Sequence, residues 1–322
     1  MSLTLSEFSL IDDYIATSAT SRADVCVGIG DDCAVVEVPP GKSLAVSMDT
    51  LVAGRHFIEA VDAVSLGHKA LAVNLSDLAA MGAEPAWATL SLTMPEANLR
   101  WIRDFMQGFF AVADRFGVQL VGGDTTRGPL SITVQIHGFV DPRKMMRRDG
   151  ANPGDLIYVT GSLGDAGLAL RLQQSGKLDI VRHQQLLRRL DYPTPRVTEG
   201  MQLASIATSA IDLSDGLIGD LGHIVQQSHC GATIELQRLP CSAAVKQVIA
   251  ESSEWSLPLS SGDDYELCFT IPADNQQQLQ TLAATLDSPL TRIGAIEQQP
   301  GIRCINAEGA IVDVESGYDH FK

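Results

Sequence analysis

Apolar runs with the length of β-strands alternate with amphipathic helical patterns along the whole chain. Short apolar runs bounded by Gly, Pro, Asp or Ser are typical of strands. We expect strands at residues 43–47, 88–93, 119–121, 132–140, 156–160, 210–213, 232–236 and 266–271. The alternation of these runs with helices predicts a mixed α/β fold, either α/β or α+β.

The clearest helix is expected over residues 63–81, where Leu71, Leu75 and Leu78 fall on one stripe. Gly82 follows as a terminator, because glycine readily adopts the left-handed conformation that ends helices. A second helix is expected to begin at Gly216 and to end before Gly231.

The length of 322 residues corresponds to about two domains. Residues 142–154 are polar and basic and contain a Pro-Gly pair, so this segment is the best candidate for a connection between domains. No short repeat and no low-complexity tract is present.

The formal net charge of −16 argues against non-specific binding to nucleic acid or to an anionic membrane, since both need a basic surface. The apolar fraction of 45% argues against disorder. We find neither a signal peptide nor a membrane span. The six cysteines form no C-x-x-C pair, which favours buried, reduced thiols in a cytoplasmic protein over a disulfide framework or a zinc site.

Aspartates are the most informative feature, because many of them follow apolar runs and stand beside Gly, Ser or Thr. We expect them at strand ends or helix starts, where small neighbours leave the backbone accessible. The segments contain Asp31, Asp32, Asp49, Asp77, Asp124, Asp212, Asp215, Asp263 and Asp264. A single Asp after a strand is usually a turn residue or a helix cap. Six such segments in one chain favour a shared cluster that binds hard cations.

A cluster of carboxylates needs a counter-charge, since like charges a few ångströms apart raise one another's pKa. Mg²⁺ supplies that charge, and an acidic protein can then hold polyphosphates through bridging metals instead of lysines. The residues alone therefore indicate metal-dependent phosphate chemistry.

Familiar nucleotide motifs are absent, including the G-x-x-x-x-G-K-[ST] phosphate loop and a complete dinucleotide fingerprint. The glycine-rich segment 161–167 resembles a turn that binds phosphate through its backbone N–H groups, but such segments are more often simple turns. The basic segment 143–148 could clamp phosphate oxygens through its arginines, although a solvated connection is the more common meaning.

Long motifs give the chain a family resemblance. They occupy residues 7–11, 28–34, 49–52, 69–83, 122–128, 211–217 and 264–267. With these motifs the chain resembles the thiamine-monophosphate kinase family almost from end to end. That family belongs to a superfamily with aminoimidazole ribonucleotide synthetase, selenophosphate synthetase and a hydrogenase maturation protein.

The resemblance implies two domains: residues 1–148 would bind metal and ATP and would form a homodimer through their strands, and residues 149–322 would complete the ATP and substrate site. It places ATP in the cleft between the domains. The γ-phosphoryl group would pass directly to thiamine monophosphate to give thiamine diphosphate. Mg²⁺ would bridge the phosphates, with K⁺ as a candidate further ion. No side chain is needed as a general acid or base, because the acceptor is already an anionic phosphate oxygen.

Family positions transfer to this sequence residue by residue. The metal contacts implied are Asp32, Ser47, Met48, Asp49, Asp77, Asp124, Asp212 and Asp215. The ATP contacts implied are Gly123, Asp124, Arg148 and Ser214. The thiamine phosphate would be bordered by His56, Asp263 and Tyr318.

Two positions depart from the family pattern. Met48 stands where many relatives carry Thr, so a metal contact there would use its backbone carbonyl. The segment 261–264 reads Ser-Gly-Asp-Asp in place of Ser-Gly-Gly-Glu-Asp, which leaves a shorter carboxylate at Asp263. The substrate contact at this position is therefore open.

Two other functions are compatible with parts of the pattern. One is another ATP-dependent activity of the superfamily, a cyclo-ligase or selenophosphate synthesis; the latter is expected to show a reactive Cys in a glycine-rich N-terminal segment. The other is a non-catalytic metal-binding protein, which would explain the acidity but not the specific Gly-Asp and Ser-Asp segments.

Overall fold

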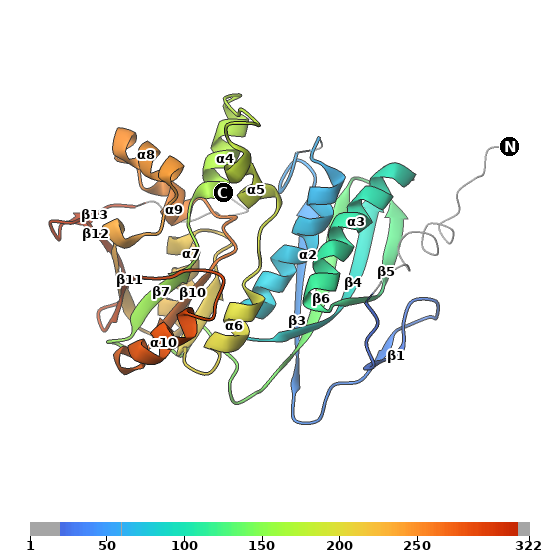
Figure 1. Ribbon diagram of the computed structural model, residues 1–322, viewed down its shortest axis with the longest axis horizontal. Helices are drawn as coiled ribbons and strands as arrows, with labels where there is room; N and C mark the ends of the chain where they lie inside the picture. Colours follow the sequence, from blue (N-terminus) through green and yellow to red (C-terminus); the bar gives the residue numbers. More distant parts are fainter. Residues whose placement is uncertain (1–19, 59, 315–322) are drawn as a thin grey trace. The chain divides into compact units, whose positions relative to one another are not determined.

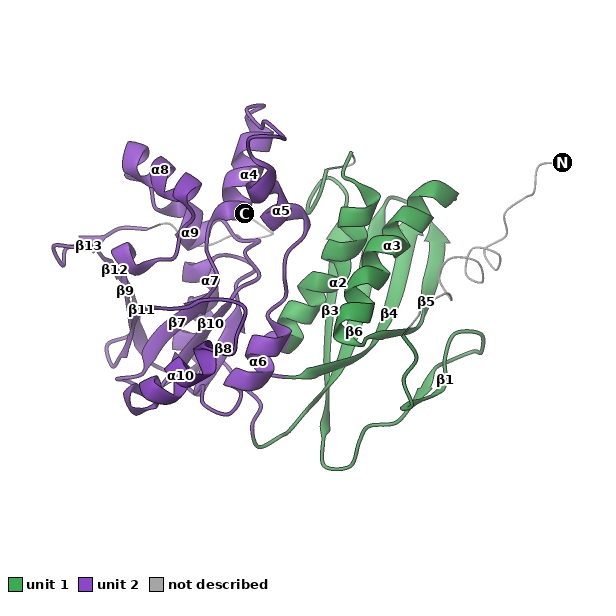
Figure 2. Ribbon diagram, in the orientation of Figure 1, with its two compact units in different colours: residues 1–78, 83–143 green, residues 79–82, 144–322 purple. Residues whose placement is uncertain are grey.

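The computed structural model describes residues 20–58 and 60–314, and it divides into two compact units (Figure 2). Unit 1 comprises Met1–Leu78 and Ala83–Arg143, and unit 2 comprises Ala79–Gly82 and Lys144–Lys322. The chain thus passes into unit 2 inside the expected connection 142–154. The motif 7–11 and Tyr318 lie outside the described residues.

Unit 1 is built on a four-stranded sheet in the order β3-β6-β4-β5. Its strands are β3 (Ser43–Val52), β4 (Glu84–Met94), β5 (Gln119–Arg127) and β6 (Ser131–Val140). The β4–β5 pair is parallel and the other two pairs are antiparallel. A separate hairpin joins β1 (Val25–Val27) to β2 (Val35–Val36).

Two helices, α2 (Ala63–Ala80) and α3 (Leu99–Phe116), cover one face of this sheet (Figure 1). The predicted stripe of α2 is buried, with Leu71 and Leu75 at 0% exposure. The two helices cross closely at glycines: a Cβ at Gly67 would lie 1.9 Å from the Phe105 carbonyl oxygen, and one at Gly108 would lie 1.8 Å from that of Val64. Small residues at this crossing therefore let the helix backbones touch.

The two faces of the sheet differ in burial. On β6, Ile132, Val134 and Ile136 are buried on the helix-covered face, and the residues between them face the other way. On that second face, Val46 and Met48 of β3 are 51% and 60% exposed. This second face is called the open face below.

Unit 2 contains a seven-stranded mixed sheet in the order β13-β12-β9-β11-β7-β10-β8. Its strands are β7 (Leu156–Thr160), β8 (Ser209–Asp212), β9 (Gly231–Glu235), β10 (Leu267–Ile271), β11 (Leu290–Glu297), β12 (Gly301–Ile305) and β13 (Ile311–Val312). Its α-helices are α4 (Asp165–Gln174), α5 (Gln184–Asp191), α6 (Val197–Leu203), α7 (Leu217–Gln227), α8 (Ala243–Ser252), α9 (Ser256–Ser260) and α10 (Gln276–Ala283). Short 3₁₀ turns occupy η2 (Leu236–Arg238) and η3 (Ala273–Asn275).

The larger core of unit 2 joins the sheet to α7. Leu217, Leu221 and Ile224 of α7 are at most 1% exposed, and they pack with residues of the central strands such as Ile157 and Ile211. The helix begins at Leu217 after Gly216 and ends at Gln227, as the apolar spacing predicts.

The prediction of a mixed α/β fold in two domains is confirmed. Every expected strand is present, but β5 continues beyond the expected residue 121 to Arg127 because its Gly-Gly-Asp-Thr-Thr segment pairs with β4. All six cysteines are free, and three of them are buried, but Cys26 and Cys33 are exposed. In residues 20–58 and 60–314, no helix is both long and apolar enough to cross a bilayer.

Candidate functional site

Strand β3 and helix α2 bring three of the predicted metal contacts together in unit 1. The Ser47 hydroxyl donates a hydrogen bond to Oδ2 of Asp77. Two residues along the strand, the backbone N–H of Asp49 donates to Oδ1 of Asn74 over 3.1 Å. Asn74 and Asp77 lie three residues apart on one side of α2, so strand and helix together present a row of oxygen atoms.

The positions of these aspartates differ from the expectation of strand ends and helix starts. Asp49 lies within β3, Asp124 lies within β5, and Asp77 lies in the last turn of α2. The expectation was wrong for these three residues because flanking Ser, Thr and Gly, which are typical of turns, here occupy regular elements.

Asp124 lies far from this row. It pairs with Ser91 of β4, Ser91 pairs with Thr133 of β6, and Thr133 pairs with Thr50 of β3. Paired residues point to the same face, so Asp124 is on the open face with Thr50 and Met48, whereas Asp49 is on the helix-covered face. Three inter-strand steps of about 4.8 Å separate the β3 and β5 edges by about 14 Å.

The remaining predicted residues of unit 1 lie on loops. Asp32 is exposed in the β1–β2 connection, and its N–H donates to Oδ1 of Asp31 over 2.9 Å. His56 follows β3, and its Nδ1 accepts the N–H of Val52 over 3.0 Å. This hydrogen bond leaves Nε2 as the ring nitrogen that carries the proton in the neutral imidazole.

Gly123 has a role inside the sheet. A Cβ there would lie 1.9 Å from the carbonyl oxygen of Leu90 on the neighbouring strand. The close approach of β5 to β4 therefore requires glycine at this position, whatever else its backbone contacts.

In unit 2, the predicted metal and ATP contacts lie on one turn between β8 and α7. Asp212 is the last residue of β8 and is 5% exposed, while Ser214 and Asp215 are half-buried just before the helix. A second segment is bonded to this turn: Asp263 N–H donates to the Ser214 carbonyl over 2.9 Å, and Tyr265 N–H donates to the Leu213 carbonyl over 2.8 Å. The predicted substrate residue Asp263 therefore lies directly beside the predicted nucleotide turn.

Asp220, which the sequence analysis missed, supports the same turn. It is 3% exposed on the first turn of α7, and its Oδ2 accepts the N–H of Asp215 over 3.1 Å. Burial first, and then the Asp215 charge, raise the pKa of Asp220 to about 7. Its spacing of five residues from Asp215 was the available signal, but Asp on the first turn of a helix is common on electrostatic grounds alone.

The basic segment near residue 147 is largely paired with its own neighbours. Arg143 bonds to Asp141 and Arg147 bonds to Asp149 in exposed ion pairs. Arg148 is exposed, and its nearby positive charge offsets a small part of the rise in the pKa of Asp220 that burial and Asp215 cause. Arg148 is thus the member of the segment that the fold places next to the Ser214–Asp215 turn.

The described residues contain no group of three or more His, Cys, Asp and Glu side chains that could hold a metal ion. The oxygen atoms of Ser47, Asp77, Asp49 and Asn74 still fit Mg²⁺, because this ion prefers hard oxygen ligands. It is commonly bound through one or two carboxylates, with phosphate and water oxygens completing its six ligands.

Comparisons with known proteins identify the family of the chain. Residues 30–140 match the AIR synthase related protein N-terminal domain, and residues 152–305 match the C-terminal domain of the same kind. The thiamine-monophosphate kinase of Escherichia coli (strain K12) is 48% identical over 318 residues, covering 98% of each chain. The chain belongs to the thiamine-monophosphate kinase family.

Solved structures of the family extend the likeness to three dimensions. The crystal structure of the kinase from Stenotrophomonas maltophilia K279a is 46% identical with a TM-score of 0.88, covering 96% of this chain and 98% of that one. AaThiL complexed with AMPPCP and TMP is 31% identical with a TM-score of 0.76, covering 99% of this chain and 100% of that one. The hydrogenase maturation protein HypE in complex with ATP, at 19% identity and a TM-score of 0.76, shares the fold.

Proposed function

We propose that this protein is an ATP-dependent kinase that transfers the γ-phosphoryl group of ATP to thiamine monophosphate, giving thiamine diphosphate and ADP. Relatives that carry this name align with the chain from end to end. The observation in the structure that supports it best is the row of oxygens formed by Ser47, Asp49, Asn74 and Asp77. Such a row suits Mg²⁺ that is shared with phosphate oxygens.

The reaction needs positioning and charge neutralisation more than acid–base chemistry. The P–O bond to the transferred γ-phosphoryl group breaks at the ADP oxygen, and a new P–O bond forms to an anionic phosphate oxygen of the acceptor. Mg²⁺, when bound, supplies the positive charge that brings two polyanions together. The chain itself holds the carboxylates of Asp49 and Asp77 on regular elements, and in the proposal it binds the nucleotide through Gly123, Arg148 and Ser214.

The proposal assigns metal and ATP contacts in each unit. Those of unit 1 are Asp32, Ser47, Met48, Asp49, Asp77, Gly123 and Asp124, and those of unit 2 are Arg148, Asp212, Ser214 and Asp215. Substrate contacts are assigned to His56, Asp263 and Tyr318. K⁺ remains a candidate further ion, and its requirement is read from activity in potassium against sodium salts. The protein is proposed to act in the cytoplasm.

The proposal includes a homodimer formed through the open face of unit 1. Val46 and Met48 are exposed apolar side chains on that face, and Leu44 beside them is 42% exposed. Exposed apolar groups on one sheet face favour contact with a matching surface, and most soluble homo-oligomers are twofold dimers.

The test of the kinase is direct. With ATP, Mg²⁺ and thiamine monophosphate, the protein is expected to form thiamine diphosphate and ADP in equal amounts. The variant Asp77→Asn is expected to lower turnover at least a hundredfold, because one charged oxygen ligand of Mg²⁺ is lost. For the same reason it is expected to raise the Mg²⁺ concentration needed for the half-maximal rate.

Asp104→Asn is the matched control, since Asp104 lies on α3 in exposed ion pairs with Arg100 and Arg103. It should keep wild-type turnover. Formation of no thiamine diphosphate under varied metal and potassium conditions would contradict the kinase, and equal activity of the two variants would contradict the metal role of Asp77.

The two alternative functions have no specific observation in their favour. The likeness to HypE is 18–19% in sequence and shows the fold alone.

A further inference from the structure

The segment 261–265, which carries the proposed substrate residue Asp263, has an unusual backbone. Gly262, Asp263 and Tyr265 have φ values of 69°, 61° and 48°. A left-handed conformation is uncommon outside glycine and is an outlier for a bulky side chain. At Asp263 and Tyr265, which are not glycines, this strained conformation persists only where the surrounding structure enforces it.

On one side, the turn Leu213–Ser214 enforces this backbone. Besides the two hydrogen bonds described above, the N–H of Leu213 donates to the carbonyl of Glu266 over 2.8 Å. A Cβ at Gly262 would lie 2.5 Å from the Ser214 carbonyl oxygen. The segment is thus pressed against the turn that carries the proposed ATP contact Ser214.

On the other side, the glycines of segment 161–167 make room for it. A Cβ at Gly161 would lie 2.0 Å from Oε1 of Glu266, and one at Gly167 would lie 2.0 Å from Oγ of Ser261. The N–H of Gly164 donates to both carboxylate oxygens of Asp264, over 2.9 and 3.2 Å. The glycine spacing that suggests a phosphate cradle in the sequence is therefore explained by packing against residues 261–266.

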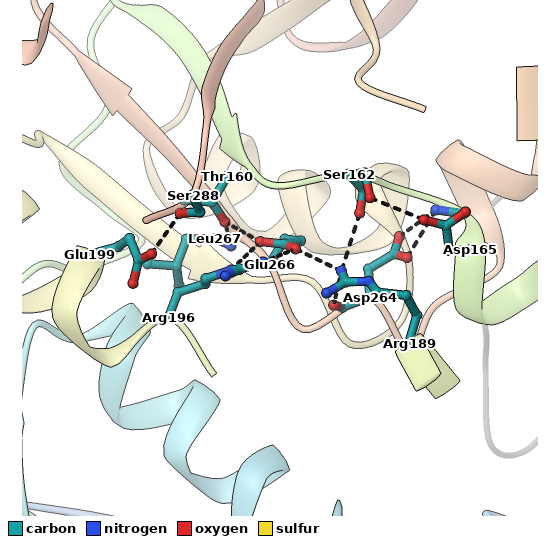
Figure 3. A network of polar contacts seen from close by, with 11 residues as sticks. Thr160, Ser162, Asp165, Arg189, Arg196, Glu199, Asp264, Glu266, Leu267 and Ser288 are labelled. Atoms are coloured by element: carbon teal, nitrogen blue, oxygen red, sulfur yellow. Dashed lines mark hydrogen bonds and ion pairs between the residues drawn. The ribbon is translucent and has the colours of Figure 1, made fainter. Parts of the chain in front are cut away.

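A buried ion cluster anchors the end of the segment (Figure 3). Glu266 is fully buried, and its carboxylate accepts hydrogen bonds from Arg189, Arg196 and the hydroxyl of Thr160 over 2.5–2.7 Å. Arg189 also donates to the carbonyl oxygen of Asp264 over 3.3 Å. The backbone on both sides of Tyr265 is therefore fixed by buried charge-assisted bonds.

From this fixed position the hydroxyl of Tyr265 contacts Asp263. Its Oη donates to Oδ1 of Asp263 over 3.0 Å, and Tyr265 itself is 9% exposed whereas Asp263 is half-buried. A charge-assisted hydrogen bond of this kind restricts the rotamers of the carboxylate. Thiamine monophosphate carries a permanently cationic thiazolium ring, which an oriented carboxylate suits.

We propose that Tyr265 is a positioning residue of the kinase: its hydroxyl holds the Asp263 carboxylate in the orientation that contacts thiamine monophosphate. The inference rests on the proposed function, in which Asp263 borders that substrate. It also explains how Asp263, a carboxylate shorter than the family's usual Glu, contacts the substrate at this position. Its short side chain has few rotamers, and Tyr265 holds it in place.

The test is the variant Tyr265→Phe, which removes the hydroxyl and keeps the ring and the backbone. We expect the KM for thiamine monophosphate to rise about tenfold, as for a lost hydrogen bond to a charged group. The KM for ATP and the kcat should stay within about twofold of the wild-type values. The melting temperature should stay within about 2 °C of that of wild type. Tyr158→Phe is the matched control, because Tyr158 lies on β7 of the same unit and its Oη accepts a long hydrogen bond of 3.5 Å from the side-chain amide of Gln276.

Asp263→Asn and the double variant separate the inference from the proposed function. If Tyr265 acts through Asp263, Asp263→Asn raises the KM for thiamine monophosphate, and adding Tyr265→Phe to it changes that KM no further. An effect of Asp263→Asn with none of Tyr265→Phe overturns the inference and leaves the substrate assignment intact.

Three other outcomes also overturn the inference. Absence of any effect of Asp263→Asn removes the substrate assignment on which it rests. A lower melting temperature with both KM values unchanged makes Tyr265 a stabilising residue only. Additive effects in the double variant make the two side chains independent.

Discussion

Replacing Glu266 by Gln removes the negative charge at the centre of the buried ion cluster while keeping the size of the side chain. Glu266 is 0% exposed, and Arg189 and Arg196 are 21% and 13% exposed at their side chains. The variant leaves two guanidinium groups with no carboxylate between them. Removing one partner of a buried ion pair costs about 3–5 kcal/mol, because the remaining charge stays buried without compensation.

The measurement is urea unfolding of Glu266→Gln beside wild type, with thermal unfolding as a second readout. For a unit of this size, about 3–5 kcal/mol corresponds to a fall in melting temperature of roughly 6–20 °C. The matched control is Glu254→Gln, whose partner Arg171 forms an ion pair in which the two side chains are 49% and 41% exposed. An exposed pair contributes about 0–1 kcal/mol, so this control should change the unfolding free energy little.

Equal, small losses of unfolding free energy in the two variants would refute the reasoning. Burial would then have no effect on how much a charged side chain contributes to stability. A larger loss in Glu254→Gln than in Glu266→Gln would refute it as well.

Two further predictions follow from single contacts. Arg148→Ala should raise the KM for ATP severalfold with little change in the KM for thiamine monophosphate, because the proposed donor to the ATP phosphates is lost. Steady-state kinetics measures both constants, and Arg147→Ala, whose partner is Asp149, is the control. Asp24→Asn should lower stability by about 1–3 kcal/mol near neutral pH, because Arg22 first and Trp87 next lower the pKa of the Asp24 carboxyl. A carboxyl whose pKa is lowered in the folded state stabilises the fold at pH values above its unfolded-state pKa of about 3.9. This stabilisation is lost as the pH falls. The difference in the free energy of unfolding between Asp24→Asn and wild type should therefore be constant above about pH 5 and vanish on further acidification. Urea unfolding followed by Trp fluorescence measures this difference, and a difference that grows below pH 4 would contradict the prediction.

Local patterns predicted the elements that carry the site. The apolar spacing of Leu71, Leu75 and Leu78 predicted α2, and its flank carries Asn74 and Asp77. Strands β11 to β13 were missed, because residues 290–312 mix charged and apolar positions without a long apolar run. Pairing of β11 with β7 and β9, and of β12 with β9, determines the first two of these strands, and β13 pairs in turn with β12. Such pairing leaves little local signal.

The arrangement of the site depends on tertiary contacts that no local pattern records. Asp220 and Glu266 read as ordinary acidic residues, and only burial beside Asp215 and the two arginines distinguishes them. The glycines at 161, 164 and 167 form a regular spacing that suggests a phosphate turn, whereas their neighbours in space are residues 257–266. Motif length could identify the family, but the strand order was needed to show that Asp49 and Asp124 occupy different faces and edges of one sheet.

Turnover of the single variants Asp49→Asn, Asp77→Asn and Asp124→Asn tests the central claim most directly, namely that acidic side chains from separate parts of the fold serve one metal-dependent site. Each variant is expected to form thiamine diphosphate at least a hundredfold more slowly and to need more Mg²⁺ for its half-maximal rate, because one charged oxygen ligand is lost. The fold should stay intact, so the far-UV circular dichroism of each variant should match that of wild type. Wild-type turnover in any two of the three variants would contradict the claim.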